Sequence, residues 1–246
     1  MTDFFLWGSA AAVIIGGFVK GTLGFGFPVV ATPLIALLSD VPTAVVLCLV
    51  PNISMNFLQA VSRPLQRETI QHLLPLVVAG VVGVPVGTKL LATLPGSTLR
   101  LWLGVMVLAF VGLQFLPWKL SPPRSHWALV TAATGAVSGV IGGMTNVYTP
   151  VVMFFYAVES DKRSFVQYTG ATFFVFQLTQ VAATYHFALW TWTLALLVLP
   201  LTGVGLLGFW GGRYIHTRLP EKIFRRAVLL AITIAGVALV FRSLRW

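Results

Sequence analysis

Two glycine-rich stretches hold the residues of this sequence best suited to bind a ligand, at 16–28 (GGFVKGTLGFGFP) and 135–150 (GAVSGVIGGMTNVYTP). Glycine and proline weaken helices, so each stretch predicts an interrupted helix with free backbone groups. Lys20 lies in the middle of the first stretch, whereas the other basic residues lie at the ends of apolar segments. A cation near the N-termini of helices suits an anion. The two stretches therefore predict an anion-binding site.

Two other interpretations of these stretches stay open. Glycines at a spacing of four residues, as at Gly17 and Gly21 or at Gly135 and Gly139, also permit close packing of helices. The long side chain of Lys20 can instead extend its charged end to the surface.

Side-chain amides on neighbouring segments extend the candidate site. Asn52, Asn56 and Gln59 share one helix face by their spacing, and so do Gln177 and Gln180 in the other half of the sequence. Such amides either donate to an anion or bond between helices, at about 0.6 kcal/mol each. The predicted substrate-binding residues are Lys20, Gly21, Thr22, Gly24, Gly26, Asn52, Asn56, Gly142, Gly143, Thr145, Asn146, Tyr168, Thr172 and Gln177.

The composition places these residues in a membrane protein. Of the 246 residues, 57% are hydrophobic and 9% are charged, whereas soluble domains carry about 25% charged residues. A soluble fold of this size cannot bury so much apolar surface. A soluble enzyme, a nucleic-acid-binding protein and a disordered chain are therefore excluded, and the lipid bilayer is the expected surrounding.

The types of residue present also limit the chemistry. The four histidines are scattered, Cys48 is the only cysteine, and no nucleophile–base set, phosphate loop or metal cluster is visible. We therefore expect neither an enzyme nor a cofactor. All six acidic residues lie near segment ends, whereas carriers of cations and protons usually place carboxylates at depth. A small anion is the better expectation for the substrate.

The apolar runs predict an all-α polytopic membrane protein. They cover 4–19, 22–38, 41–61, 72–94, 99–117, 127–141, 145–158, 163–185, 188–212 and 223–241. A helix needs about 20 apolar residues to cross the hydrocarbon core. The pairs 4–19/22–38 and 127–141/145–158 consist of shorter pieces, so each half is expected to have one short broken or re-entrant helix pair and three spanning helices.

The two halves of the sequence repeat each other. Residues 74–100 match residues 199–225 at nine of 27 positions. Each half has five apolar segments, an odd number, so the repeats are expected to have inverted topology. We expect an N-terminal repeat at 1–117, a linker at 118–126 and a C-terminal repeat at 127–246, all in one membrane domain.

The positions of Lys and Arg predict the topology. If each short pair enters and leaves on one side, eleven basic residues collect on one face and four on the other; if each pair crosses once, the split is nine against six. Basic residues favour the cytoplasmic side, so the first topology is preferred, with both termini outside the cytoplasm of a bacterial inner membrane. Without Lys or Arg before Lys20, the first segment is expected to be retained.

These motifs resemble the TauE/SafE sulfite exporter family of membrane permeases. The similarity lies in the pattern Gly-x-x-x-Gly-x-x-Gly-x-Gly from Gly17, its repeat from Gly135, and the Gly-x-x-x-Gly…Leu-Pro pattern at 83–95 and 208–220. It covers nearly the whole chain. The sequence departs from the family at 143–146 (Gly-Met-Thr-Asn), where further glycines are common, and at Lys20.

The resemblance implies a secondary transporter of small sulfur-containing or organic anions, such as sulfite or sulfonates, usually moved outward. We predict export across the inner membrane by alternating access, with the two breaks meeting near the midplane. The alternatives are an anion channel of the same fold, and a non-transporting membrane enzyme or assembly subunit. The sequence leaves the oligomeric state open, and a homo-oligomer is one option.

Overall fold

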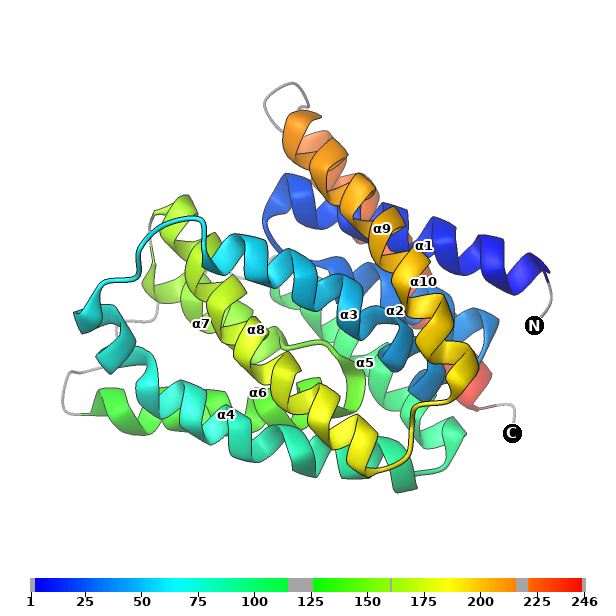
Figure 1. Cartoon of the computed structure of the whole chain (residues 1–246), viewed down its shortest axis with the longest axis horizontal. Helices are drawn as coiled ribbons and strands as arrows, with labels where there is room; N and C mark the ends of the chain where they lie inside the picture. Colours follow the sequence, from blue (N-terminus) through cyan, green and yellow to red (C-terminus); the bar gives the residue numbers. More distant parts are fainter. Residues whose placement is uncertain (1–2, 115–125, 160, 216–220, 245–246) are drawn as a thin grey trace.

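The computed structural model describes residues 3–114, 126–159, 161–215 and 221–244, and every regular element in these ranges is a helix (Figure 1). The helices are α1 (Asp3–Leu23), α2 (Phe27–Leu38), α3 (Val41–Ala60), α4 (Arg67–Thr93), α5 (Gly96–Leu113), α6 (Trp127–Thr145), α7 (Thr149–Val158), α8 (Lys162–His186), α9 (Trp192–Ile215) and α10 (Glu221–Ser243). Seven of them are long and apolar enough to cross a membrane. The prediction of an all-α polytopic membrane protein is confirmed.

The structure corrects the expected length of the broken helices. α1 has 21 residues and α6 has 19, and both are candidate spans, so only α2 and α7 are short, with 12 and 10 residues. The breaks are narrower than the glycine-rich stretches and cover residues 24–26 and 146–148. A glycine weakens a helix by only about 1 kcal/mol, and packing against a neighbouring helix offsets this loss in the glycine-rich turns of α1 and α6.

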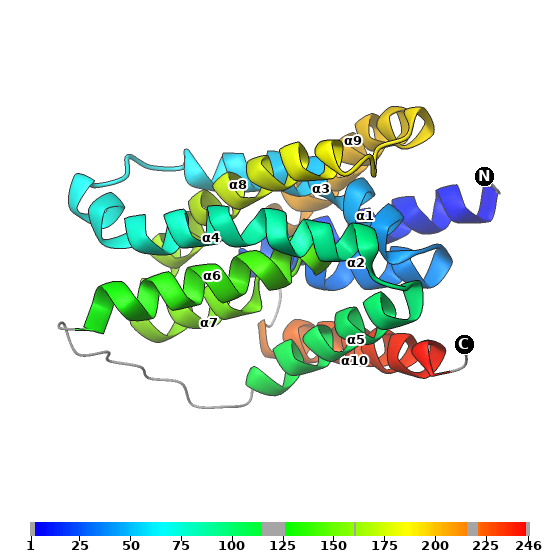
Figure 2. The same cartoon turned by 90° about the horizontal axis from the view of Figure 1, so that it is seen from below.

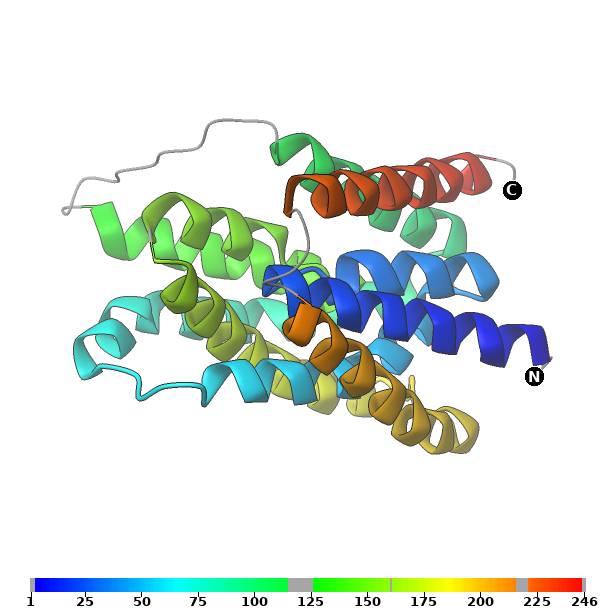
Figure 3. The same cartoon turned by 90° about the horizontal axis from the view of Figure 1, so that it is seen from above.

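The helices pack as two bundles, and each bundle contains three helices from one half of the sequence and one helix from the other half. The first bundle contains α1, α2, α3 and α9, and the second contains α6, α7, α8 and α4. α4 lies along α6 in Figure 2, and α9 lies along α1 in Figure 3. α3 packs against α8 between the bundles, and α5 and α10 pack against each other to one side, next to α2 (Figure 2).

The pattern of helix pairs is the one expected for a repeated chain. In the repeat, α1 to α5 are equivalent to α6 to α10 in order. If each helix is replaced by its equivalent, the pair α1–α9 becomes the pair α6–α4, and the pairs α3–α8 and α5–α10 stay the same. The inverted orientation of the halves stays a prediction. Except for His126, the expected linker at 118–126 lies outside the described residues.

Glycines bring the backbones of the exchanged helices into contact. A Cβ atom on Gly17 or Gly21 would meet the carbonyl oxygen of Gly205 or Phe209 on α9, and one on Gly139 would meet the carbonyl oxygen of Gly80 on α4. Small residues of this spacing allow membrane helices to approach closely. The packing interpretation of the four-residue glycine spacing is therefore correct for these positions.

The close approach of α1 and α9 predicts that Gly21→Ala destabilises the protein. The added Cβ would meet backbone atoms of Phe209 and lie 2.9 Å from the nitrogen of Arg213, and backbone atoms cannot move aside as a side chain can. We expect a loss of about 1–3 kcal/mol, measured as a lower denaturation temperature in detergent. Gly203→Ala on α9 is the matched control, because a Cβ there meets nothing within 4 Å. Equal stability of the two variants would contradict the close packing.

The central helices α3 and α8 both begin with an aspartate N-cap. Asp40 caps α3 by accepting from the Thr43 backbone N–H at 2.8 Å, and Asp161 caps α8 by accepting from the Ser164 N–H at 2.9 Å. An Asp at this position satisfies an otherwise unpaired N–H and favours the helix dipole. The two caps are 121 residues apart in the sequence and set the register of two equivalent helices.

The cap of α8 predicts a pH-dependent contribution to stability. The hydrogen bonds from the Ser164 backbone and hydroxyl hold the pKa of Asp161 below its usual value. A carboxyl whose pKa is lower in the folded state stabilises the fold above its unfolded pKa and loses this effect as the pH falls. We expect Asp161→Asn to lower the denaturation temperature at neutral pH, and the difference from wild type to shrink in acid. A difference that is independent of pH would exclude this role for the charge.

Candidate functional site

Lys20 is buried within α1 rather than placed in a break. It lies in the last turn of the helix, one turn before Gly24, and its side chain is 2% exposed. Its Nζ donates to Oδ1 of Asn52 at 2.7 Å and to Oδ1 of Asn56. Both acceptors lie on the same face of α3. The expectation that Lys20 sits in the middle of a break is wrong, and its burial excludes the alternative that it extends to the surface.

A chain of side-chain amides continues from Lys20 to the second break. Asn56 Nδ2 donates to Gln177 Oε1 at 2.7 Å, and Gln177 Nε2 donates to Asn146 Oδ1 at 3.0 Å. Asn56 belongs to α3 of the first bundle, Gln177 to α8 of the second, and Asn146 to the break after α6. We call Lys20, Asn52, Asn56, Gln177 and Asn146 the polar chain. All five are buried, and they link the two bundles.

The ammonium group of Lys20 sets the direction of every hydrogen bond in the polar chain. Lysine only donates, so Asn56 must turn its oxygen towards Lys20 and its NH2 group towards Gln177. Gln177 must then accept from Asn56 and donate to Asn146. The chain ends in Asn146 Nδ2, and the branch through Asn52 ends in Asn52 Nδ2. Neither nitrogen has a hydrogen-bond partner among the described residues.

Every side-chain oxygen of the polar chain accepts a hydrogen bond, so the two unpaired groups of the chain are both NH2 donors; the unpaired oxygen of Gln59 lies outside the chain. A buried donor without a partner is unfavourable by about 1–3 kcal/mol, and buried polar groups in proteins are almost always paired. A ligand that only accepts hydrogen bonds would satisfy Asn52 and Asn146, whereas a cation would meet further donors. The arrangement is therefore suited to an anion.

The first break is a glycine turn held by α3. Gly24 and Gly26 have φ angles of 88° and 100°, a left-handed region that glycine adopts without a steric penalty. Gln59 Nε2 donates to the Gly24 carbonyl at 2.7 Å. α2 begins after Gly26 without a side-chain cap, so no N-cap side chain pairs the N–H groups of its first turn, in which Pro28 itself has no N–H.

The second break uses asparagine where the first uses glycine. Asn146 has a φ angle of 63°, a conformation that asparagine tolerates better than most residues. Gln180 Nε2 donates to the carbonyls of Gly142 at 3.2 Å and Gly143 at 3.1 Å, and Tyr148 OH donates to Gln180 Oε1 at 2.7 Å. Asn146 thus provides both the turn and the end of the polar chain. This explains why the departure from glycine at 143–146 is compatible with the fold.

The predicted site residues fall into three groups. Five form the polar chain, and five shape the breaks, namely Gly24, Gly26, Gly142, Gly143 and Thr145, whose Oγ1 accepts from the Val147 N–H at 3.2 Å. Four lie elsewhere. Gly21 packs against α9, Thr22 donates to the Gly212 carbonyl of α9 at 3.3 Å, and Thr172 is buried on α8 outside the chain.

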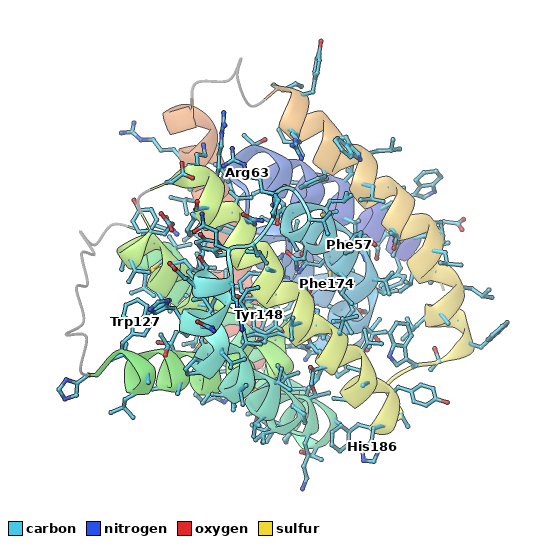
Figure 4. The ribbon with its side chains drawn as sticks, turned by 60° about the vertical axis from the view of Figure 1, so that its left-hand side comes forward. Phe57, Arg63, Trp127, Tyr148, Phe174 and His186 are labelled. Atoms are coloured by element: carbon cyan, nitrogen blue, oxygen red, sulfur yellow. The ribbon has the colours of Figure 1, made fainter. Side chains whose placement is uncertain are left out.

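Tyr168 is the fourth predicted residue that belongs to neither the polar chain nor the breaks. It lines a pocket of about 260 Å³ together with Gln66, Glu68, Thr69, His72, Leu73, Trp127, Phe154, Phe155, Val158 and Glu159. Its hydroxyl lies 3.4 Å from Thr69 Oγ1. Tyr148, by contrast, lies in the interior (Figure 4) and packs against the rings of Phe173 and Phe176.

Gln59, Tyr148 and Gln180 hold the two breaks but are absent from the predicted substrate-binding residues, although the sequence analysis placed the two glutamines on the faces of Asn56 and Gln177. The signal for the two glutamines was present, because each follows a member of the polar chain by three residues: Gln59 follows Asn56 and Gln180 follows Gln177. No periodicity marks Tyr148, since it lies in the break itself.

The charge of the site comes from Lys20 alone. It is the only charged side chain among the buried residues that the structure describes. The described acids Asp3, Asp40, Glu68 and Asp161 are exposed, and Glu159 is half-buried. Among the acids whose side-chain burial the structure describes, none is fully buried.

These features define a polytopic helical membrane protein with a cation-centred polar interior between two broken helices. Residues 9–239 match the family model described as "Sulfite exporter TauE/SafE". The chain belongs to this family, whose members are membrane transporters of sulfite or related anions rather than enzymes. Comparisons with curated proteins and with solved structures gave no significant match.

Proposed function

We propose that this protein is a secondary transporter that exports a small sulfur-containing anion, such as sulfite or an organosulfonate, by alternating access. The observation that carries the proposal is the polar chain, in which Lys20 orients the amides and the buried NH2 groups of Asn52 and Asn146 have no hydrogen-bond partner among the described residues. Lys20 attracts the anion, and the two amides and the uncapped first turns of α2 and α7 donate to its oxygens.

The packing of the helices supports a movement of the two bundles rather than of the two sequence halves. α1 is locked to α9 and α4 to α6 by backbone contacts at glycines, so these pairs move together. α3 and α8 meet between the bundles, and the hydrogen bond from Asn56 to Gln177 connects them within the polar chain. Since the chain is buried, an anion reaches it only when the bundles separate on one side. Rocking of the bundles would open the two sides in turn.

The orientation proposed for this cycle follows from the distribution of basic residues. Both termini lie outside the cytoplasm of a bacterial inner membrane, because this places the face with eleven basic residues inside. Each negative charge that leaves a negative-inside cell gains about 2.3 kcal/mol per 100 mV. Export of an anion then proceeds without a coupled ion.

Exchange of labelled sulfite in proteoliposomes tests the proposal. Vesicles loaded with unlabelled sulfite should accumulate external labelled sulfite transiently, and the initial rate should saturate with concentration. Protein-free vesicles are the control. Conductive flux without such counterflow would indicate the channel alternative, and the absence of any flux would favour the non-transporting alternatives.

A further inference from the structure

We propose that the site accepts singly charged oxoanions, such as hydrogen sulfite and alkylsulfonates, and discriminates against dianions such as sulfate and doubly charged sulfite. This inference rests on the proposed function, because it names the charge state of the anion that occupies the same site. It follows from the number of charges in the buried interior and from the neutrality of the other donors.

The described interior contains one basic side chain that can carry a positive charge. Lys20 is 2% exposed, and it is the only Lys, Arg, Asp or Glu among the buried residues of the described ranges. An ion with one negative charge would leave the site neutral overall. An ion with two would leave one uncompensated negative charge in a medium of low dielectric constant, which is strongly unfavourable.

The other donors bind oxygens without neutralising them. Asn52 and Asn146 contribute NH2 groups that carry no net charge. The N-termini of α2 and α7 carry partial positive charge, but each lies directly after the C-terminus of α1 or α6, at residues 24–26 and 146–148. A helix C-terminus carries the opposite partial charge, so the two ends at each break act against each other. The number of negative charges that the site can balance is therefore set by Lys20.

Equilibrium exchange of labelled sulfite across a pH series tests this inference. Wild-type protein in liposomes is measured with the same pH on both sides and with the membrane potential clamped at zero, between about pH 6 and about pH 9. In this range sulfite changes from its singly to its doubly charged form. We expect the half-saturating concentration of total sulfite to rise about tenfold per pH unit once the dianion predominates.

Two competing anions separate the charge of the substrate from titration of the protein. Methanesulfonate is singly charged throughout the range, so it should inhibit exchange with the same strength at every pH. Sulfate is doubly charged throughout and should be weaker than methanesulfonate by at least about tenfold. Sulfate that competes as well as methanesulfonate, or sulfite that binds more tightly as the pH rises, would overturn the inference and leave the proposed function intact. Methanesulfonate that fails to compete would exclude alkylsulfonates. If sulfite is not exchanged at any pH, the proposed function itself is wrong.

Discussion

Lys20→Met is expected to abolish anion exchange without loss of the fold. Methionine matches the length and volume of the buried lysine stem but removes the charge that attracts the anion and orients Asn52 and Asn56. Loss of one partner of a buried charge pair corresponds to about 3–5 kcal/mol. At 1.4 kcal/mol per tenfold change, the half-saturating concentration of sulfite should rise more than about 100-fold.

A stability measurement distinguishes this loss of binding from misfolding. Lys20→Met leaves Oδ1 of Asn52 and Asn56 buried without their donor, so the variant should melt in detergent below the wild-type temperature but still in one cooperative transition. Lys89→Met is the matched control, because Lys89 is exposed on α4, and it should exchange sulfite like the wild type. Unchanged sulfite affinity in Lys20→Met would remove Lys20 from the site and make it a structural residue.

Gln177→Glu is expected to inactivate the protein at neutral pH through charge alone. The carboxylate has almost the same shape as the amide and still accepts from Asn56, but it cannot donate to Asn146. Its negative charge also cancels the positive charge of Lys20 through the shared Asn56. Since the site then has no net charge to attract an anion, sulfite exchange should fall by about 100-fold or more.

Acidification should restore the activity of Gln177→Glu. A protonated glutamic acid both donates and accepts, as glutamine does, so the sulfite exchange rate relative to wild type should increase as the pH falls. Gln71→Glu adds the same charge at an exposed position of α4 and should follow the wild type at every pH. Wild-type exchange by Gln177→Glu at neutral pH would show that the polar chain does not set the charge of the site.

The sequence predicted all five residues of the polar chain because they are unusual for their surroundings. Lys20 is the only basic residue within the two glycine-rich stretches, and Asn56 and Gln177 occupy matching segments of the two halves. Their contact follows from the repeat, since equivalent helices meet where the halves meet. The fold class followed from composition and from the spacing of the apolar runs.

The extent of α1 could not be predicted, because it depends on a contact that is distant in the sequence. Gly17 and Gly21 weaken the helix locally, and only the backbone of α9 close to them compensates for this. Tyr168 illustrates a second limit. It is polar and lies on the same helix as Gln177, but nine residues at about 1.5 Å per residue place it about 14 Å away, at the pocket near Thr69.

The exchange of α9 and α4 between the bundles has a consequence for biosynthesis. The first turns of α1 leave the ribosome about 190 residues before α9, which at about 5–20 residues per second is an interval of roughly 10–40 s. During this time the face of α1 that contains Gly17 and Gly21 has no helix of its own half to pack against. In the nascent N-terminal half this face is therefore covered by lipid or by a chaperone. Since each bundle includes a helix from the other half, neither half can complete its bundle alone. The first bundle is completed only when α9 has been translated.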